Sequence, residues 1–327
     1  MKSVVLVCLT ALSILTSSFN AQAASDEEMW QSLQKAAIAA RALNYQGIFV
    51  CQKGNQSRSV QITHLFNGQG EFARNVILDT APREVLSQGG DLVIYNPKNE
   101  KVIIERRRGR NMFPAVLPAN LEPIKASYAV RLGDVETVAG RQAQILFLDT
   151  RDNYRYSYQF WIDSEFGMLL KSALLNQRNQ VIETMAFNQL SMMNSLNLDW
   201  FKPTFNSNKN YVMEDEVPVV ANGSSANWVV KDLPPGFRKI DQVTRIEHNR
   251  TTPVTQLVFS DGLASVSLFI EPMPKLADSK PVSKGLHGMV GNANFYVSAI
   301  NGYRVTALGE VPEVTVAQIA NAIVFNK

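Results

Sequence analysis

The chain has 327 residues, of which 46% are hydrophobic and 19% are charged, and its formal net charge is +3. This is the composition of an ordinary globular protein, and the length suggests two domains. The charge is close to balance, so it gives no case for nucleic acid as a partner.

The first residues have the pattern of a cleavable secretory signal. Lys2 precedes an apolar run at residues 4–15, and a polar stretch then ends in Ala21-Gln22-Ala23. The run is shorter than the roughly 20 residues that span a bilayer, and the small-x-small ending predicts cleavage after Ala23. We therefore expect residues 1–23 to be removed. Cys51 then remains as a single cysteine without an internal disulfide, and we expect it to be a small buried side chain.

Residues 24–202 are predicted to form a large first domain. Asp26 can cap a helix whose apolar positions recur at three- and four-residue spacing from Met29 to Leu43. Strand-like segments follow at 45–52, 59–66, 71–78, 84–88, 91–96, 101–106, 141–149, 156–162, 168–175 and 181–190. Between the segments 101–106 and 141–149, a short helix with loops is expected at 114–129. This pattern predicts an antiparallel, half-open barrel that can enclose an apolar cavity.

A polar stretch at 203–227, rich in Asn, Ser and acidic residues, is predicted to be a linker to a second domain at 228–327. Alternating segments at 255–260 and 264–271 are joined by Asp261-Gly262, a strong hairpin signal. Further strands are expected at 285–290, 294–300 and 303–310. A closing helix is expected after Pro312, with apolar positions from Val314 to Ile323. The second domain is therefore predicted to be a small antiparallel sheet with a helix.

The sequence lacks the motifs that carry catalysis or bind metals. His64, His248 and His287 are the only histidines, and they are far apart without a partner at metal-ligand spacing. We therefore expect no metal, no cofactor and no enzymatic activity. An envelope enzyme of unrecognised type is a weaker, alternative interpretation. Loss of activity on mutating one of the three histidines would favour it.

Two sets of residues are candidates for ligand contacts. The first could bind phosphates or carboxylates through guanidinium groups, although a solvated hairpin tip is the equally weighted alternative; it consists of Arg106, Arg107, Arg108 and Arg110. The second could line an apolar cavity for acyl chains, although core packing is the commoner role of such residues; it consists of Phe49, Phe66, Phe72 and Phe160.

The order of these signals resembles the MucB/RseB family of sigma-E regulatory proteins. The resemblance covers nearly the whole mature chain, and its strength lies in the ordered set, because no single motif is diagnostic. The set comprises the signal peptide, the helix leading to Tyr45-Gln46-Gly47-Ile48-Phe49-Val50, the pair Phe160-Trp161-Ile162-Asp163 and Gly167-Met168-Leu169-Leu170-Lys171, and the turn Leu233-Pro234-Pro235-Gly236-Phe237.

The resemblance implies a periplasmic protein of Gram-negative bacteria that binds the periplasmic part of the anti-sigma factor RseA and shields it from the protease DegS. It also implies that lipopolysaccharide or another lipid loosens this complex. The larger domain should look like the lipoprotein carriers LolA and LolB, and the smaller domain should contribute to partner binding. The alternative is a periplasmic lipid or lipoprotein carrier, and self-association stays open.

Overall fold

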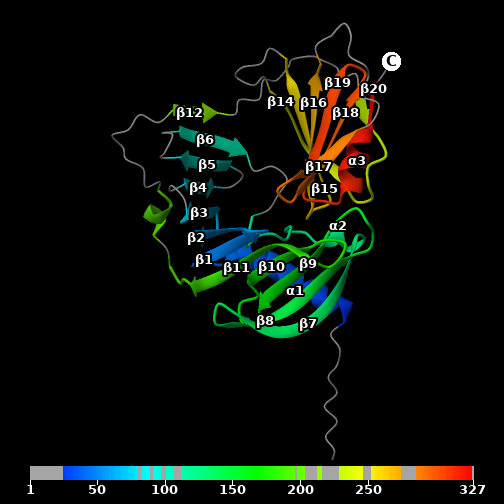
Figure 1. Cartoon of the computed structure of the whole chain (residues 1–327). Helices are drawn as coiled ribbons and strands as arrows, with labels where there is room; N and C mark the ends of the chain where they lie inside the picture. The colour runs from blue at the N-terminus through cyan, green and yellow to red at the C-terminus, as the bar shows by residue number, and fades with distance from the viewer. Residues whose placement is uncertain are drawn as a thin grey trace, which may run out of the picture.

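The structure is a computed structural model that describes residues 25–79, 83–88, 91–96, 101–106, 112–195, 197–202, 212–215, 228–245, 252–273 and 285–325. The expected signal peptide lies outside these residues. Two bodies built mainly from β-strands lie against each other (Figure 1). Among the helices in the described ranges, none combines the length and apolar character needed to cross a membrane.

Helix α1 (Asp26–Ala42) opens the larger body. Ser25, rather than the expected Asp26, is its N-cap, because the Ser25 hydroxyl accepts the Glu28 amide and the Glu28 carboxylate accepts the Ser25 amide. This reciprocal pair is a capping box, which satisfies two amide groups that the first turn leaves open. One face of the helix is buried, and it includes Leu33, Ala36 and Ala40.

One sheet of twelve strands forms the larger body, in the order β12-β6-β5-β4-β3-β2-β1-β11-β10-β9-β8-β7. Its strands are β1 (Tyr45–Lys53), β2 (Gln56–Phe66), β3 (Glu71–Ile77), β4 (Arg83–Gln88), β5 (Asp91–Asn96), β6 (Lys101–Arg106), β7 (Tyr128–Val138), β8 (Arg141–Thr150), β9 (Ser157–Asp163), β10 (Leu169–Leu175), β11 (Val181–Met192) and β12 (Val212–Asp215). Helix α2 (Glu122–Lys125) and the 3-10 helix η1 (Leu198–Phe201) complete it. The sheet curls strongly, so that β7–β10 wrap around α1 (Figure 1).

The smaller body is a six-stranded antiparallel sheet in the order β14-β15-β16-β19-β18-β17, with helix α3 packed against it (Figure 1). Its elements are β14 (Arg238–Arg245), β15 (Val254–Ser260), β16 (Ser265–Pro272), β17 (Leu286–Val290), β18 (Ala293–Ile300), β19 (Tyr303–Gly309) and α3 (Glu313–Asn321). A two-stranded ribbon of β13 (Trp228–Val230) and β20 (Ile323–Phe325) closes this body.

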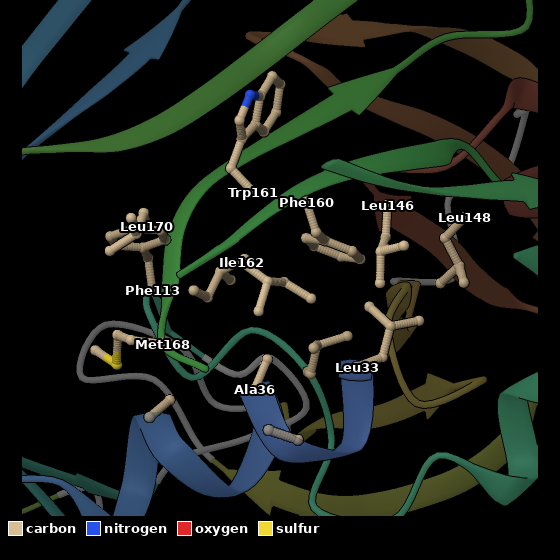
Figure 2. Packing of buried hydrophobic residues seen from close by; sticks show 14 of the residues in the cluster. Leu33, Ala36, Phe113, Leu146, Leu148, Phe160, Trp161, Ile162, Met168 and Leu170 are labelled. Atoms are coloured by element: carbon tan, nitrogen blue, oxygen red, sulfur yellow. The ribbon is translucent and has the colours of Figure 1, made fainter. Parts of the chain in front are cut away.

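Each body has its own hydrophobic core. In the larger core, Leu33 and Ala36 of α1 face Leu146, Phe160 and Ile162 of β8 and β9, whereas Trp161 points away from the helix (Figure 2). This alternation follows from the two-residue period of a strand. The smaller core packs Val316 and Ile319 of α3 on the sheet.

The architecture confirms the predicted fold class, a large antiparallel half-barrel followed by a small sheet with a helix. Three expectations need correction. The sequence predicted no strand where β7, β12 and β14 lie, and β12 falls within the stretch expected to be a structureless linker. Ile323, expected at the end of the closing helix, begins β20. Cys51 lies in β1 as expected but is only half-buried.

Candidate functional site

The interior of the half-barrel is filled by the chain itself. Residues 112–121, which we call the strap, belong to no strand of the described sheets and lead directly into α2. The ring of Phe113 is 3% exposed, and its centroid lies 5.0 Å from that of Phe49 and 5.1 Å from that of Phe187. Leu117 and Leu121 are buried in the same core. The strap therefore closes the interior as an apolar plug.

Side chains of α1 attach the strap. The Arg41 guanidinium donates to the carbonyl oxygens of Ala115, at 3.2 Å, and Leu117, at 2.8 Å. The Gln34 amide donates to the Ala119 carbonyl oxygen at 2.8 Å. Segments held by such contacts, without a backbone ladder, open at a lower free energy than core strands do. In the described residues, the strap is thus held by side-chain contacts and is not itself part of the sheet.

A groove of about 500 Å³ lies beside α1. The helix contributes Ile38 and Lys35, and the turn between β9 and β10 contributes Phe166. Ile38 is 54% exposed and Phe166 39% exposed, while Leu146 and Ile162 lie at the inner wall of the groove. The groove thus joins exposed apolar side chains to the edge of the core, and its lining residues include Lys35 and the two acidic residues Asp163 and Glu165.

The turn beside this groove is fixed by a buried carboxylate. Asp163 pairs with Arg141 and accepts the amide groups of Glu165 and Phe166, both at 2.8 Å. Burial alone would raise the pKa of Asp163, but the hydrogen bonds from Arg141 and from these amides outweigh it and hold the pKa below the usual value. The turn is therefore held by an ionised side chain.

The junction between the two bodies is built around Arg155, which is completely buried. Its guanidinium donates to Asp261 of the smaller body at 2.6 Å, to Asp152 at 3.0 Å and to the Pro235 carbonyl oxygen. The Tyr128 hydroxyl also donates to Asp261, at 3.3 Å. Burial and the nearby Asp261 carboxylate raise the pKa of Tyr128 well above its usual value, so the hydroxyl keeps its proton. Every member of this cluster has a partner of opposite charge or a hydrogen bond.

A tight turn at 260–264 of the smaller body makes several of these contacts. In the turn 260–264, Asp261 accepts the amides of Leu263 and Ala264, and Gly262 has a φ of +112°. A Cβ on Gly262 would lie 2.9 Å from Ile124 of α2, which is too close for a side chain. Leu263 packs within the core of the larger body. The junction therefore requires glycine at this position for two independent reasons.

Further contacts surround the buried cluster. The Thr315 hydroxyl donates to the Tyr154 carbonyl oxygen at 2.6 Å, and the Asn292 amide donates to the Ile182 carbonyl oxygen at 2.6 Å. Lys53 forms an ion pair with Glu310 across the junction. Desolvation alone would lower the pKa of Lys53, but Glu310 and then Glu183 raise it above the usual value. The junction therefore combines these polar, directional contacts with the apolar contact that Leu263 makes in the larger core.

Among the described residues, the four aromatic residues predicted to line a cavity lie in different environments. Phe49 and Phe160 lie in the larger core, Phe66 is 40% exposed, and the ring centroid of Phe72 lies 6.0 Å from that of Phe201. None of the four lines the groove beside α1. Arg106 ends β6, whose side chains are not described, and Arg107, Arg108 and Arg110 lie outside the described residues. The phosphate-binding role of the arginines stays a prediction.

Sequence reasoning missed the residues that organise the junction and the strap. The Asp261-Gly262 hairpin signal marked one turn, but nothing in the sequence paired it with Arg155. Of the histidines, His64 is buried and its ring stacks on Tyr45, with centroids 4.7 Å apart, and His287 pairs with Glu313 at 2.7 Å. His248 lies outside the described residues. In the part of the chain that the structure describes, no cluster of metal-ligating side chains is found.

Comparison with known proteins gives similarity over nearly the whole chain. The profile of the MucB/RseB N-terminal domain matches residues 28–205, and that of the MucB/RseB C-terminal domain matches residues 222–324. The sigma factor AlgU regulatory protein MucB of Pseudomonas aeruginosa is 28% identical, over 92% of this chain and 91% of its own length. The sigma-E factor regulatory protein RseB of Haemophilus influenzae is 26% identical, over 96% of each chain.

Solved structures show the same arrangement of elements. The crystal structure of MucB in complex with MucA(peri) matches with a TM-score of 0.73 at 25% identity, over 91% of this chain and 99% of that chain. The crystal structure of MucB alone matches with a TM-score of 0.62 at 24% identity.

Proposed function

The chain belongs to the MucB/RseB family of sigma factor regulatory proteins, which are not enzymes, and on that premise we propose that it is a periplasmic negative regulator of the sigma-E envelope stress response. It binds the periplasmic domain of an RseA-type anti-sigma factor and shields that domain from DegS. Lipopolysaccharide or another lipid then releases it. The observation that carries the proposal is the likeness, across both bodies, to MucB in complex with MucA(peri).

The structure supports a physical route from a lipid to a protein partner. The strap, which closes the apolar interior, continues directly into α2. Ile124 of α2 packs against Gly262, and the next residue, Leu263, completes the core of the larger body. Displacement of Phe113 by an acyl chain would therefore shift the surface on which the smaller body rests. Such a shift would loosen the contact between Asp261 and Arg155 and change how the two bodies face a partner.

Thermodynamic linkage turns this route into regulation. If lipid favours an arrangement that holds the anti-sigma factor poorly, lipid and anti-sigma factor must weaken each other's binding by the same factor. To move the equilibrium from 1:99 to 99:1, lipid must bind the released form about 10⁴-fold more tightly. The groove beside α1, with exposed Ile38 and Phe166, offers an apolar wall next to the core for this purpose.

The decisive experiment uses the mature chain, residues 24–327, and the purified periplasmic segment of the anti-sigma factor. We expect tight binding by calorimetry, slower DegS cleavage of the segment in the complex, and loss of both when lipopolysaccharide is added. Changing Arg106, Arg107, Arg108 and Arg110 to serine should weaken lipid binding without unfolding the chain. Absence of binding to the anti-sigma segment would contradict the proposal.

A lipid or lipoprotein carrier is the alternative function, and the half-barrel with its apolar interior is the observation that supports it. A carrier would transfer bound lipid to acceptor vesicles, whereas a regulator would exchange lipid for a protein partner. The buried junction favours the regulator, because a carrier has no need of a second body locked to the first by Arg155 and Asp261. Efficient transfer to vesicles without affinity for the anti-sigma segment would establish the carrier.

A further inference from the structure

The strand β12 is an unusual member of the large sheet. It pairs in parallel with β6, from Val212 opposite Lys101 to Asp215 opposite Ile104, whereas the other strand pairs of the described sheets are antiparallel. The pairing covers four residues of each strand, and parallel pairs are slightly less stable per residue than antiparallel ones. All of β7–β11 separate the two strands along the chain, so no tight turn places β12 beside β6.

Without β12, β6 would be the outer strand of the sheet. Its sequence, Lys101-Val102-Ile103-Ile104-Glu105-Arg106, contains three consecutive β-branched apolar residues and no proline. An unpaired edge of this kind presents a row of amide and carbonyl groups to any extended segment. Adding a strand to such an edge is a common way to bind a peptide.

The opposite edge of the same sheet is protected against such pairing. In β7 the register shifts between Leu132 and Val135, which marks a bulge, and Arg131, Asp134 and Glu136 are exposed charges on the strand. Bulges and charges are the devices by which proteins block edge pairing. Both edge strands carry charged residues, but only β7 has a register shift, so the β6 edge is the one that is open to an added strand.

Charge indicates which segment the β6 edge accepts. β6 carries Lys101, Glu105 and Arg106, a net positive charge, and the strand that occupies its edge carries Glu214 and Asp215. Because the pair is parallel, the acidic end of β12 lies toward the end of β6 that carries Arg106. The occupant is thus a short, extended and acidic segment.

We propose that the outer edge of β6 is a strand-acceptor site, which β12 occupies within the chain and which an acidic, extended segment of a protein partner takes by displacing it. Because β12 belongs to the same chain as β6, its pairing is intramolecular, and it competes strongly with a free peptide. This site goes beyond the proposed function, because it concerns neither the apolar interior nor the junction.

A disulfide lock tests the proposal. Val102 and Met213 are direct partners in the register, and neighbouring strands lie about 4.8 Å apart, within the Cα separation that a disulfide allows. We would prepare the mature chain with Cys51→Ser, Val102→Cys and Met213→Cys. The probe is a fluorescent peptide of residues 209–217 of this chain, and its charge control carries lysine in place of Glu214 and Asp215.

We expect the oxidised lock to bind no peptide and the reduced form of the same protein to regain binding. A separate variant, Glu214→Pro, weakens β12 in the chain and should bind the peptide at least about tenfold more tightly than the wild type, because the internal competitor is removed. The charge-control peptide should bind more weakly to both.

Failure of the disulfide to form would overturn the proposal, as would equal peptide binding by the locked and reduced proteins or no binding by Glu214→Pro. A locked protein that still binds the anti-sigma segment with full affinity would place that partner elsewhere and leave the proposed function intact. Loss of anti-sigma binding on locking would identify that segment as the natural occupant of the β6 edge.

Discussion

The interior of the half-barrel and the junction between the two bodies are both buried, but different forces hold them. The interior is closed by apolar contacts of Phe113 and Leu117, and a few side-chain hydrogen bonds attach the strap to α1. The junction is held by Arg155 and Asp261, both charged and both almost completely buried. Apolar contacts are not directional, so another apolar group can replace them. Removing one partner of a buried ion pair is costly, because the other charge is left buried and unpaired.

In the proposed mechanism, this difference gives the two regions different parts in regulation. An acyl chain would replace side chains of the interior. The junction, which is closed in the structure with Arg155 and Asp261 paired, would then open and return these charges to water. The four substitutions below test this division, in order of their expected effect on stability.

Arg155→Met should have the largest effect. It leaves the Asp261 carboxylate buried with the Tyr128 hydroxyl as its only remaining side-chain donor among those described, and breaking a buried pair costs about 3–5 kcal/mol. We expect the free energy of unfolding in urea to fall by about 4 kcal/mol. The double variant with Asp261→Asn should regain part of this, since asparagine still accepts the amides of Leu263 and Ala264. A single variant as stable as the wild type would show that the junction does not depend on the ion pair.

Phe113→Ala should come next, with a different signature. Phenylalanine-to-alanine changes in a core cost about 3–5 kcal/mol, and we expect the low end of this range because the strap can partly collapse. The variant should also bind a fluorescent fatty acid more tightly, because the plug against Phe49 and Phe187 is gone. The matched control is Phe259→Ala in the smaller core, which should lose similar stability without any gain in affinity. Equal fatty-acid binding by both variants would refute the role of the strap as a plug.

Arg41→Met should have a smaller and more local effect. It removes the hydrogen bonds to the carbonyl oxygens of Ala115 and Leu117 and should cost about 1–2 kcal/mol. Amide hydrogen exchange should accelerate in the strap and not in β8 or β9. Gln34→Ala removes one exposed hydrogen bond to Ala119 and serves as the weaker comparison. Uniform acceleration over the whole body would mean that Arg41 supports the core rather than the strap.

The sequence predicted most of the fold because hairpins are local. Strand period and turn residues identified β1–β6 and β8–β11 with small errors at their ends. The strand β7 escaped because Gly133 and Asp134 interrupt its apolar alternation, and the structure shows why they are present. A Cβ on Gly133 would lie 2.7 Å from the Phe147 ring, and the register shift next to it protects the sheet edge. The same feature that suits an edge strand hides the strand from pattern analysis.

The candidate site was predictable only in its chemistry. The sequence indicated an apolar interior, but it could not show that Phe113 fills it, because that contact depends on the path of an irregular segment. Arg155 and Asp261 are 106 positions apart, and each has an ordinary local context. The pairing of Arg155 with Asp261 depends on how the two bodies pack against each other, and local sequence patterns do not indicate it. The resemblance to a family, by contrast, depended on the order of many weak signals and needed no such contact.

The smallest expected effect on stability is that of Asp163→Asn, which lies outside both regions, in the turn beside the groove. Asp163 has a lowered pKa, so its interactions with Arg141 and the turn amides stabilise the fold fully above the ordinary aspartate value of about 3.9. This contribution is lost as the pH falls through the lower folded pKa. In acid unfolding, Asp163→Asn should be less stable than the wild type near neutral pH, and the difference should shrink below about pH 4. A difference that stays constant down to pH 2 would mean that the charge of Asp163 contributes nothing, and that shape alone fixes the turn beside the groove.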